Sequence, residues 1–443
     1  MGTIFGTVFA FLIVFGILVF IHEFGHFIVA KLVGVRVEVF SFGYGKRLFG
    51  FKKGQTDYRV SLVPMGGYVK LLGEGMFEPA RELAPDDLMA KTRWQRFLVM
   101  VTGSLMNILL AIFLISFINM VGVTVPEWQE QKPLIGRIDP GSPAEKSNLQ
   151  VDDEIVSINK RPVKTWMDVE IAVGSKPEKV ITLEIRRKGE IIPVQLKTEA
   201  VSRFYMGYAG FMGKILTQVM MVKPGSPAEK GGLKAGDVIM KVNNEPVYFY
   251  QFIQVLEKNP DKDLELLVER GGQTLTLHVT PRKEGKVGKI GIIQGPKSVE
   301  KKYGFFKAIG QSVNENAKNV FLIIRLLKDL FTGQASTRQL AGPLEIANIS
   351  YAMLRLGFMA MISWIAIISL QLGVINLFPI PVFDGGQIFV LILEGIFRKD
   401  FSPKVRQVWM QIGFVIFVVL IVFVIMNDLV RGLPNGWKSL VPF

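Results

Sequence analysis

From Met1 to Ile21 the chain contains no Asp, Glu, Lys or Arg, and the motif His22-Glu-Phe-Gly-His26 follows directly. An apolar stretch of this length matches the hydrocarbon core of a bilayer, which takes about 20 residues to cross. Ionisable side chains at that depth cost roughly 2.5–3.5 kcal/mol each. Histidines at positions i and i+4 share one helix face and can offer two imidazoles to one metal ion, with Glu23 beside them as a general base. The motif therefore predicts a metal site. The alternatives are a chance match or a hydrogen-bonded polar cluster, and the cost of burial in a membrane weakens the second.

Three more stretches, 97–123, 356–383 and 408–427, lack charged residues over a length that can span a bilayer. The first stretch has no basic residues ahead of its apolar core and no small-residue cleavage site, so we expect a retained span rather than a signal peptide. The mean hydropathy of +0.35 agrees with a membrane protein. The sequence thus predicts a polytopic α-helical membrane protein with four transmembrane helices, two in residues 1–123 and two in residues 356–443.

Composition limits the chemistry of the metal site and the choice of partners. The 443 residues include no cysteine, so disulfides and thiolate ligands are excluded and a metal must use imidazole, carboxylate or carbonyl groups. The 52 Lys and Arg outnumber the 38 Asp and Glu, which gives a net charge of +14. An anionic lipid surface explains this excess more simply than nucleic acid, because no basic and aromatic platform is evident. We expect the lipid bilayer as a partner and no nucleic acid.

Lysine and arginine are concentrated in two short connections, residues 31–96 after the first span and residues 398–406 between the third and fourth. The residues before Lys31 contain none. Short loops rich in these residues stay in the cytoplasm. The pattern predicts that both loops are cytoplasmic and that both termini and the long segment 124–355 lie outside.

The segment after the first span alternates between strand and turn signals. Val35–Val39 has strand character and is predicted to end at Ser41–Gly45. Asp57–Val63 and Tyr68–Leu71 also have strand character, and Pro64–Gly67 between them predicts the turn of a hairpin. The plain interpretation is a cytoplasmic hairpin. The sharper one is a hairpin that dips into protein-lined space in the membrane, where its edge can pair with an extended peptide.

The second span contains Gly103-Ser-Leu-Met-Asn107. Small residues at this spacing allow helices to pack closely. Asn107 can hydrogen-bond across helices or near the metal site, but packing is the simpler interpretation of the motif.

The outer segment contains an internal repeat. Pro140–Lys146 (Pro-Gly-Ser-Pro-Ala-Glu-Lys) recurs identically as Pro224–Lys230, at an offset of 84 residues. The same offset relates Leu149 to Leu233, Asp153 to Asp237 and Asn159 to Asn243. The repeat resembles the bacterial PDZ module, whose signature is full in the second copy, whereas the first has Asp152 in place of a glycine. We expect two extracytoplasmic PDZ-like α+β domains, residues 124–203 and 204–296, serving either as peptide-binding grooves or as rigid spacers.

Residues 297–355 follow the repeats as a linker region. Apolar residues between Phe305 and Leu327 recur with helical spacing, and basic residues interleave with them. This pattern predicts an amphipathic helix that lies on the outer membrane surface or packs against the repeats.

The third span ends in Asn376-Leu-Phe-Pro379-Ile-Pro-Val-Phe-Asp384. Its two prolines stop a regular helix, because each lacks an N–H and restricts the residue before it. The predicted orientation puts Asp384 on the same side of the membrane as His22 and His26. The orientation depends on loop charges alone, so this agreement favours a shared site, although Asp384-Gly385 can also be a simple turn.

These features together resemble the site-2 protease family. The resemblance rests on His22–His26 in a first span, on Asn376-x-x-Pro-x-Pro-x-x-Asp384-Gly in a later one, and on the two PDZ-like repeats between them. Gly66–Lys70 and Leu340-Ala-Gly-Pro343 look like members with two PDZ domains. One departure is Phe383, where the family usually has Leu.

The resemblance implies an intramembrane zinc metalloprotease. It implies that His22, His26 and Asp384 bind Zn²⁺ and that Glu23 is the general base. It further implies that Asn376 and Pro379 help to hold the substrate, and that the hairpin with Gly67 and Tyr68 clamps the unwound substrate strand.

The resemblance also implies a bacterial inner-membrane enzyme with periplasmic PDZ domains and an active site toward the cytoplasm. Its substrates would be single-span membrane proteins already trimmed by another protease, such as an anti-sigma factor, and also remnant signal peptides. The PDZ region would act as a size filter. Two other classes compete with this hypothesis. The first is a non-catalytic membrane scaffold that captures partners through its PDZ domains, and the second is a transporter that uses the intramembrane His, Glu and Asp as an ion path.

Overall fold

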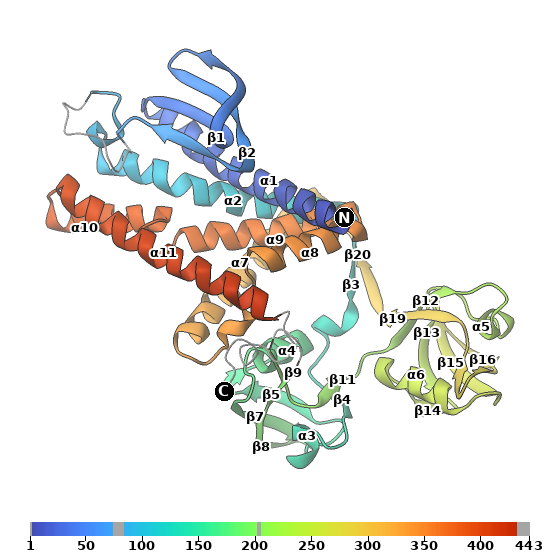
Figure 1. Ribbon diagram of the computed structural model, residues 1–443. Helices are drawn as coiled ribbons and strands as arrows, with labels where there is room; N and C mark the ends of the chain where they lie inside the picture. Colours follow the sequence, from blue (N-terminus) through green and yellow to red (C-terminus); the bar gives the residue numbers. More distant parts are fainter. Residues whose placement is uncertain (1, 74–83, 202–204, 432–443) are drawn as a thin grey trace. The chain divides into compact units, whose positions relative to one another are not determined.

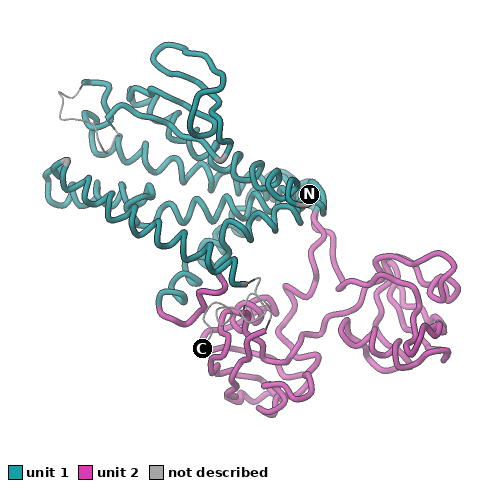
Figure 2. Tube along the Cα trace, in the orientation of Figure 1, with its two compact units in different colours: residues 1–122, 302–331, 340–443 teal, residues 123–301, 332–339 magenta. Residues whose placement is uncertain are grey.

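The computed structural model describes residues 2–73, 84–201 and 205–431, and it divides into two units (Figure 2). The first unit is formed by residues 1–122, 302–331 and 340–443, and the second by residues 123–301 and 332–339. The first is largely helical, and the second consists mainly of short β-strands (Figure 1). The repeat region is therefore inserted between the second and third apolar stretches of the sequence.

Within the described residues, four helices are long and apolar enough to cross a membrane. They are α1 (Gly2–Leu32), α2 (Arg93–Val121), α9 (Phe358–Asn376) and α11 (Pro403–Arg431). These helices confirm the four stretches predicted from the sequence. The third is shorter than predicted, because the helix ends at Asn376 and the chain turns before starting the separate helix α10 (Asp384–Phe397). The remaining long helices of this unit are α7 (Phe305–Phe331) and α8 (Pro343–Leu356).

Helix α1 packs closely on α2 because both have small residues where they meet. A Cβ added to Gly25 would lie 2.6 Å from the carbonyl oxygen of Thr102, so only glycine permits this approach. Farther along α1, Ala10, Val14 and Leu18 are fully buried against Met361 and Ile365 of α9 and their neighbours. The three helices α1, α2 and α9 thus form the core of the first unit.

Helix α7 presents mainly small and polar side chains to the other helices of the first unit. Ser312 is fully buried and its hydroxyl donates to the carbonyl of Ile112 on α2 at 2.8 Å. Val320 and Ile323 of α7 pack against the cluster around Ala111 of α2. The opposite face exposes large apolar side chains, among them Phe306, Phe321 and Phe331. The predicted amphipathic helix is confirmed. It packs on α2 and α9 of its own unit, however, whereas the sequence predicted a position on the outer membrane surface or against the repeats.

The segment after α1 forms a sheet of two long, sharply bent strands, β1 (Val37–Lys53) and β2 (Thr56–Leu71). The predicted hairpin turn at Pro64–Gly67 is wrong, and so is the predicted strand end at Ser41–Gly45. The strands continue through both places, with irregular register, and the chain reverses at Gly54 and Gln55 instead. Glycines with positive φ, including Gly43 (φ 90°) and Gly66 (φ 109°), take up the bends within the strands.

The register gives this sheet a defined free edge. Residues 39–42 of β1 pair both with residues 57–60 and with residues 67–70 of β2. Residues 47–53 pair with the other side of residues 56–61. In this pairing, segment 67–71 is joined to the sheet on one side only, so its other side is an edge.

The second unit contains two β-rich subdomains that repeat the same contacts. In the first, Arg187 forms a bidentate ion pair with buried Asp153 at 2.7 Å, and in the second Arg270 pairs in the same way with buried Asp237 at 2.6 and 2.7 Å. The side chain of Asn159 accepts from the N–H of Thr182, as that of Asn243 does from Glu265. The repeated Asp and Asn of the sequence thus hold equivalent turns.

The strand order is β6-β5-β7-β8 in the first subdomain and β16-β15-β13-β12-β19 in the second, with β14 beside β13. The pairs β11-β4, β10-β9, β17-β18 and β20-β3 complete the unit. The first core also contains Ala209, beyond residue 203 where the sequence predicted that domain to end, because β11 returns to pair with β4.

The bounds of the elements of the second unit are, in chain order, β3 (Val123–Pro126), β4 (Ile135–Ile138), α3 (Pro143–Lys146), β5 (Glu154–Ile158), β6 (Arg161–Pro162), α4 (Trp166–Gly174), β7 (Val180–Arg187), β8 (Glu190–Lys197), β9 (Glu199–Val201), β10 (Met206–Tyr208), β11 (Phe211–Gly213), β12 (Thr217–Val222), α5 (Pro227–Lys230), β13 (Val238–Val242), β14 (Glu245–Pro246), α6 (Phe249–Lys258), β15 (Leu264–Arg270), β16 (Gln273–Val279), β17 (Arg282–Glu284), β18 (Val287–Lys289), β19 (Ile292–Pro296) and β20 (Ser298–Lys301).

Candidate metal centre

Three side chains from two distant helices converge in the first unit. His22 and His26 lie one turn apart on α1, with their Nε2 atoms 3.2 Å apart. Asp384, at the first position of α10, places Oδ2 3.3 Å from Nε2 of His22 and Oδ1 3.5 Å from Nε2 of His26. One potential ligand atom from each residue lies within 4.8 Å of the others. Two imidazole nitrogens and one carboxylate oxygen around a common point are a donor set that suits zinc with an open fourth position.

The turn between α9 and α10 brings Asp384 to this point. Residues 377–383 fold back through short-range hydrogen bonds, among them Ile380 N–H to Phe378 O at 2.7 Å and Phe383 N–H to Ile380 O at 2.9 Å. A Cβ at Gly385 or at Gly386 would collide with the backbone of this turn. The prolines end α9, and the two glycines allow α10 to start against the turn.

Helix α2 supplies a second layer of polar contacts to the same side chains. The carbonyl of Val99 lies 2.7 Å from Nδ1 of His26, and the hydroxyl of Ser104 donates to Oδ2 of Asp384 at 3.1 Å. The side chain of Asn107, which is fully buried, lies 3.4 Å from Nδ1 of His22. A Cβ at Gly103 would overlap both histidine rings. Such outer contacts fix the orientation of metal-binding side chains.

Glu23 is held from the opposite direction by the sheet. Its Oε2 accepts a hydrogen bond of 2.9 Å from the backbone N–H of Val69 in the edge segment of β2. The carboxylate lines a cavity of about 260 Å³ together with the three potential ligands. Tyr68 and Asn376 also line this cavity. Of the remaining residues predicted to hold substrate, Gly67 is buried in the edge segment and Pro379 is exposed, and neither lines the cavity.

Sequence reasoning missed most of the second layer. A hydrogen bond of Asn107 near the metal site was the less favoured of its two interpretations, and the structure places its side chain beside His22. Ser104 was assigned to helix packing alone, and it also contacts the candidate centre. The carbonyl of Val99 and the N–H of Val69 are backbone groups, so no side-chain pattern identifies them. Polar residues with helical spacing in an apolar span were the signal available for Ser104 and Asn107.

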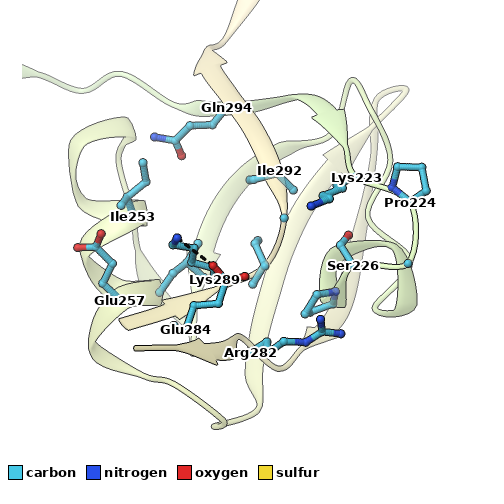
Figure 3. Close-up of a pocket in the computed structure, with 16 residues that line it drawn as sticks. Lys223, Pro224, Ser226, Ile253, Glu257, Arg282, Glu284, Lys289, Ile292 and Gln294 are labelled. Atoms are coloured by element: carbon cyan, nitrogen blue, oxygen red, sulfur yellow. Dashed lines mark ion pairs between the residues drawn. The ribbon is translucent and has the colours of Figure 1, made fainter. Parts of the chain in front are cut away.

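A second cavity, of about 500 Å³, lies in the second β-rich subdomain between α6 and β19. Figure 3 shows Ile253 and Glu257 of α6 on one side and Ile292 and Gln294 of β19 on the other. Lys289 forms an ion pair with Glu284 at 2.9 Å beside it. Strand β19 is the last strand of its sheet, so the cavity lies beside a free strand edge to which a peptide can add as a further strand.

The comparison with protein families resolves the class of the protein. The model of peptidase family M50 matches residues 10–420. The chain belongs to peptidase family M50, the site-2 proteases. This result confirms the resemblance noted from the sequence and favours the enzyme over the scaffold.

Curated relatives of this site-2 protease match it over nearly the whole chain. A putative zinc metalloprotease from Vibrio cholerae is 30% identical, over 95% of this chain and 98% of its own. Protease RseP from Yersinia pestis is 32% identical and regulator of sigma-E protease RseP from Escherichia coli is 31% identical, each with the same two coverages. Among solved structures, the PDZ domain of an SdrC-like protein from Listeria monocytogenes is 21% identical over 19% of this chain and 90% of its own, with a TM-score of 0.17. That score is too low to bear on the fold.

The protein is therefore a membrane-embedded bacterial zinc metalloprotease of the site-2 type. It acts in regulated intramembrane proteolysis. The donor set described above fits the zinc that this family uses, because two imidazoles and one carboxylate are a ligand set of catalytic zinc sites.

Proposed function

We propose that His22, His26 and Asp384 hold the catalytic zinc and that Glu23 is the general base. The observation that carries this proposal is the approach of the Asp384 carboxylate to both imidazoles, although Asp384 lies 358 positions after His26 in the sequence. Buried ionisable groups in an apolar bundle are costly and require such a shared role.

In the proposed hydrolysis of a peptide bond, each of these residues has a separate role. Zinc supplies Lewis acidity, which makes a water molecule more acidic and a peptide carbonyl more electrophilic. Glu23 takes the proton of the attacking water and delivers it to the leaving amine. The N–H of Val69 keeps the Glu23 carboxylate turned toward the cavity. Val99, Ser104 and Asn107 hold the ligand side chains in their orientation.

The edge segment 67–71 of β2 is proposed to bind the substrate strand. Tyr68 and Val69 line the cavity that contains Glu23, so a strand paired with this edge runs past the general base. A transmembrane helix hides its carbonyls in its own hydrogen bonds and must unwind before cleavage. Pairing with the edge replaces those bonds, since unmatched backbone groups in lipid cost several kcal/mol. Gly67, Asn376 and Pro379 are assigned to the same substrate path by the family resemblance.

The substrates are proposed to be single-span membrane proteins trimmed beforehand, with an anti-sigma factor as the first candidate. The names of the relatives from Yersinia pestis and Escherichia coli, which refer to RseP and the regulation of sigma E, support this choice. Remnant signal peptides are a further candidate. The charge of the short loops supports an inner-membrane enzyme with its active site toward the cytoplasm.

The two β-rich subdomains are proposed to be periplasmic PDZ-like domains that together act as a size filter. The internal repeat and the equivalent ion pairs at Asp153 and Asp237 support two copies of one module. The cavity beside α6 supports a peptide groove in the second copy. The rigid-spacer alternative predicts that deleting residues 124–296 alters the cleavage of trimmed and untrimmed substrates equally.

Reconstitution in lipid vesicles with a trimmed single-span substrate tests the assignment of the general base. Glu23→Gln keeps the shape of the side chain and removes its basicity, so cleavage is expected to fall by about 10²–10⁴-fold while zinc content is retained. Glu315→Gln on α7 is the matched control and is expected to cleave like the wild type. Full cleavage by Glu23→Gln would refute the assignment.

A further inference from the structure

The helix that carries Asp384 is fixed near its other end by a buried charge. Glu394 lies on α10, ten residues after Asp384, and none of its surface is exposed (0%). Its Oε1 accepts from Nη2 of Arg406 at 2.5 Å, from Nε of Arg406 at 3.1 Å and from the backbone N–H of Phe401 at 2.9 Å. A carboxylate without exposed surface is costly unless it is paired in this way.

The second oxygen of Glu394 faces α2. Oε2 lies 3.7 Å from Nη1 of Arg96, a side chain that is itself only 6% exposed. Arg96 is also held by Asp400 of the α10–α11 connection, at 3.3 Å. Glu394 thus joins three elements, namely its own helix, α2 through Arg96 and α11 through Arg406.

Two of the elements joined by Glu394, α10 and α2, contribute side chains or backbone groups to the candidate metal centre. Arg96 lies one turn before Val99, whose carbonyl contacts His26. Helix α10 begins with Asp384, and ten residues of helix place the two carboxylates about 15 Å apart along its axis. The rotation and height of α10 relative to α2 therefore decide whether Asp384 reaches the histidines, and the ion pair between Glu394 and Arg96 is a direct constraint on both.

Helix α11 also contacts α10 and the turn before Asp384, through side chains on one of its faces. Arg406 contacts Glu394, Met410 contacts Gln387 and the Phe417 ring lies 6.0 Å from that of Phe383. A Cβ at Gly413, on the same face, would meet Pro381. The spacing of these four positions of α11 follows the turns of the helix, so one face of it contacts α10 and the turn before Asp384.

We propose that Glu394 is a positioning residue of the metal centre: clamped between Arg96 and Arg406, it sets the rotation and height of α10 and thereby the position of Asp384. This inference rests on the proposed role of Asp384 as a zinc ligand. Glu394 does not touch the cavity and acts only through the helix.

A double-mutant cycle on zinc affinity tests the proposal. The full-length protein is purified in detergent, and zinc affinity is measured by competition with a chelator for the wild type, Glu394→Gln, Asp384→Asn and the double variant. Glu394→Gln is expected to lower affinity by about tenfold or more, as for other residues that orient metal ligands. In the Asp384→Asn background the same change is expected to have little further effect, because its route to the metal is already lost.

The visible spectrum of the cobalt-substituted protein gives a second readout. We expect the bands of Glu394→Gln to shift toward those of Asp384→Asn, since both lose the correctly placed carboxylate. Asp400→Asn is the matched control. It removes an exposed carboxylate (55% exposed) that pairs with Arg93 and Arg96 but not with Arg406. Zinc affinity is expected to stay within about twofold of the wild type, because α10 keeps the buried ion pairs of Glu394.

The outcomes separate the ligand assignment from the positioning role. If Asp384→Asn binds zinc as tightly as the wild type, the ligand assignment fails. If Asp384→Asn loses affinity and Glu394→Gln does not, or if their losses add in the double variant, the positioning role is overturned. Should Glu394→Gln not fold, the same cycle with Arg406→Lys, which keeps the charge but loses the paired contact, decides between additive and non-additive behaviour.

Discussion

At the residue scale, each donor of the candidate centre meets a second polar group that fixes its direction. Val99 contacts His26, Ser104 contacts Asp384 and Asn107 contacts His22, all from one face of α2. With Nε2 of each histidine turned to the shared point, Nδ1 is the ring atom left for these contacts. The orientation of the ligands therefore depends on α2 as much as on the helices that carry them.

Replacing Asn107 by leucine tests this dependence. The leucine has a similar volume but cannot hydrogen-bond to His22, so zinc affinity is expected to fall by about 10–100-fold. Asn119→Leu is the matched control, because Asn119 is also buried on α2 (3% exposed) and does not contact the centre. Chelator competition on both purified variants makes the measurement. Equal affinities in the two variants would contradict the role of Asn107.

At the element scale, the position of the turn 377–383 depends on helix α11. Gly413 of α11 is buried where the helix crosses Pro381. The absence of a side chain allows this contact, whereas a Cβ added to Gly395 of α10 would have no neighbour within 4 Å. The two glycines lie in helices of the same unit and differ in what surrounds them.

The pair Gly413→Ala and Gly395→Ala should therefore have opposite effects. The first forces α11 away from the turn and is expected to lower the stability of the protein by about 1–3 kcal/mol. The second replaces a flexible residue in an open helix position and is expected to stabilise by up to about 1 kcal/mol. Thermal unfolding of both variants in detergent measures the difference. Similar unfolding temperatures would show that α11 does not press on Pro381.

Some of the helices and strands could be predicted from the sequence, and others could not. The apolar spans and the repeated Asp and Asn of the β-rich subdomains follow from local pattern, because each depends on nearby residues. The hairpin turn was misplaced because Gly43 and Gly66 look like turn residues, whereas the long strands use them to bend. The third span was predicted too long because the charge-free run continues past Asn376 although the helix does not. The contacts of Glu394 with Arg96 and Arg406 join residues far apart in sequence, so no spacing rule identifies them.

At the scale of the whole molecule, the proposed function requires one orientation in the membrane. The loop charges favour a cytoplasmic location for β1 and β2 and an outer location for the β-rich subdomains. In that orientation the centre lies toward the cytoplasmic side, next to the edge of β2.

Because the chain has no cysteine, single cysteines report this orientation without background. The test uses cells with a permeabilised outer membrane and an intact inner membrane, and a maleimide that cannot cross the inner membrane. This reagent should label Glu190→Cys, at an exposed position of β8, and should not label Lys46→Cys, at an exposed position of β1. Both sites should react after detergent is added. If Lys46→Cys were labelled and Glu190→Cys were protected before detergent is added, the proposed topology would be contradicted.

The proposed mechanism depends above all on α1 and α10 sharing one zinc ion. Elemental analysis of the purified protein and three variants tests this sharing most directly. We expect about one zinc per chain in the wild type and in Glu23→Gln, and loss of zinc in both His22→Ala and Asp384→Ala. A full complement of zinc in Asp384→Ala would contradict the shared site.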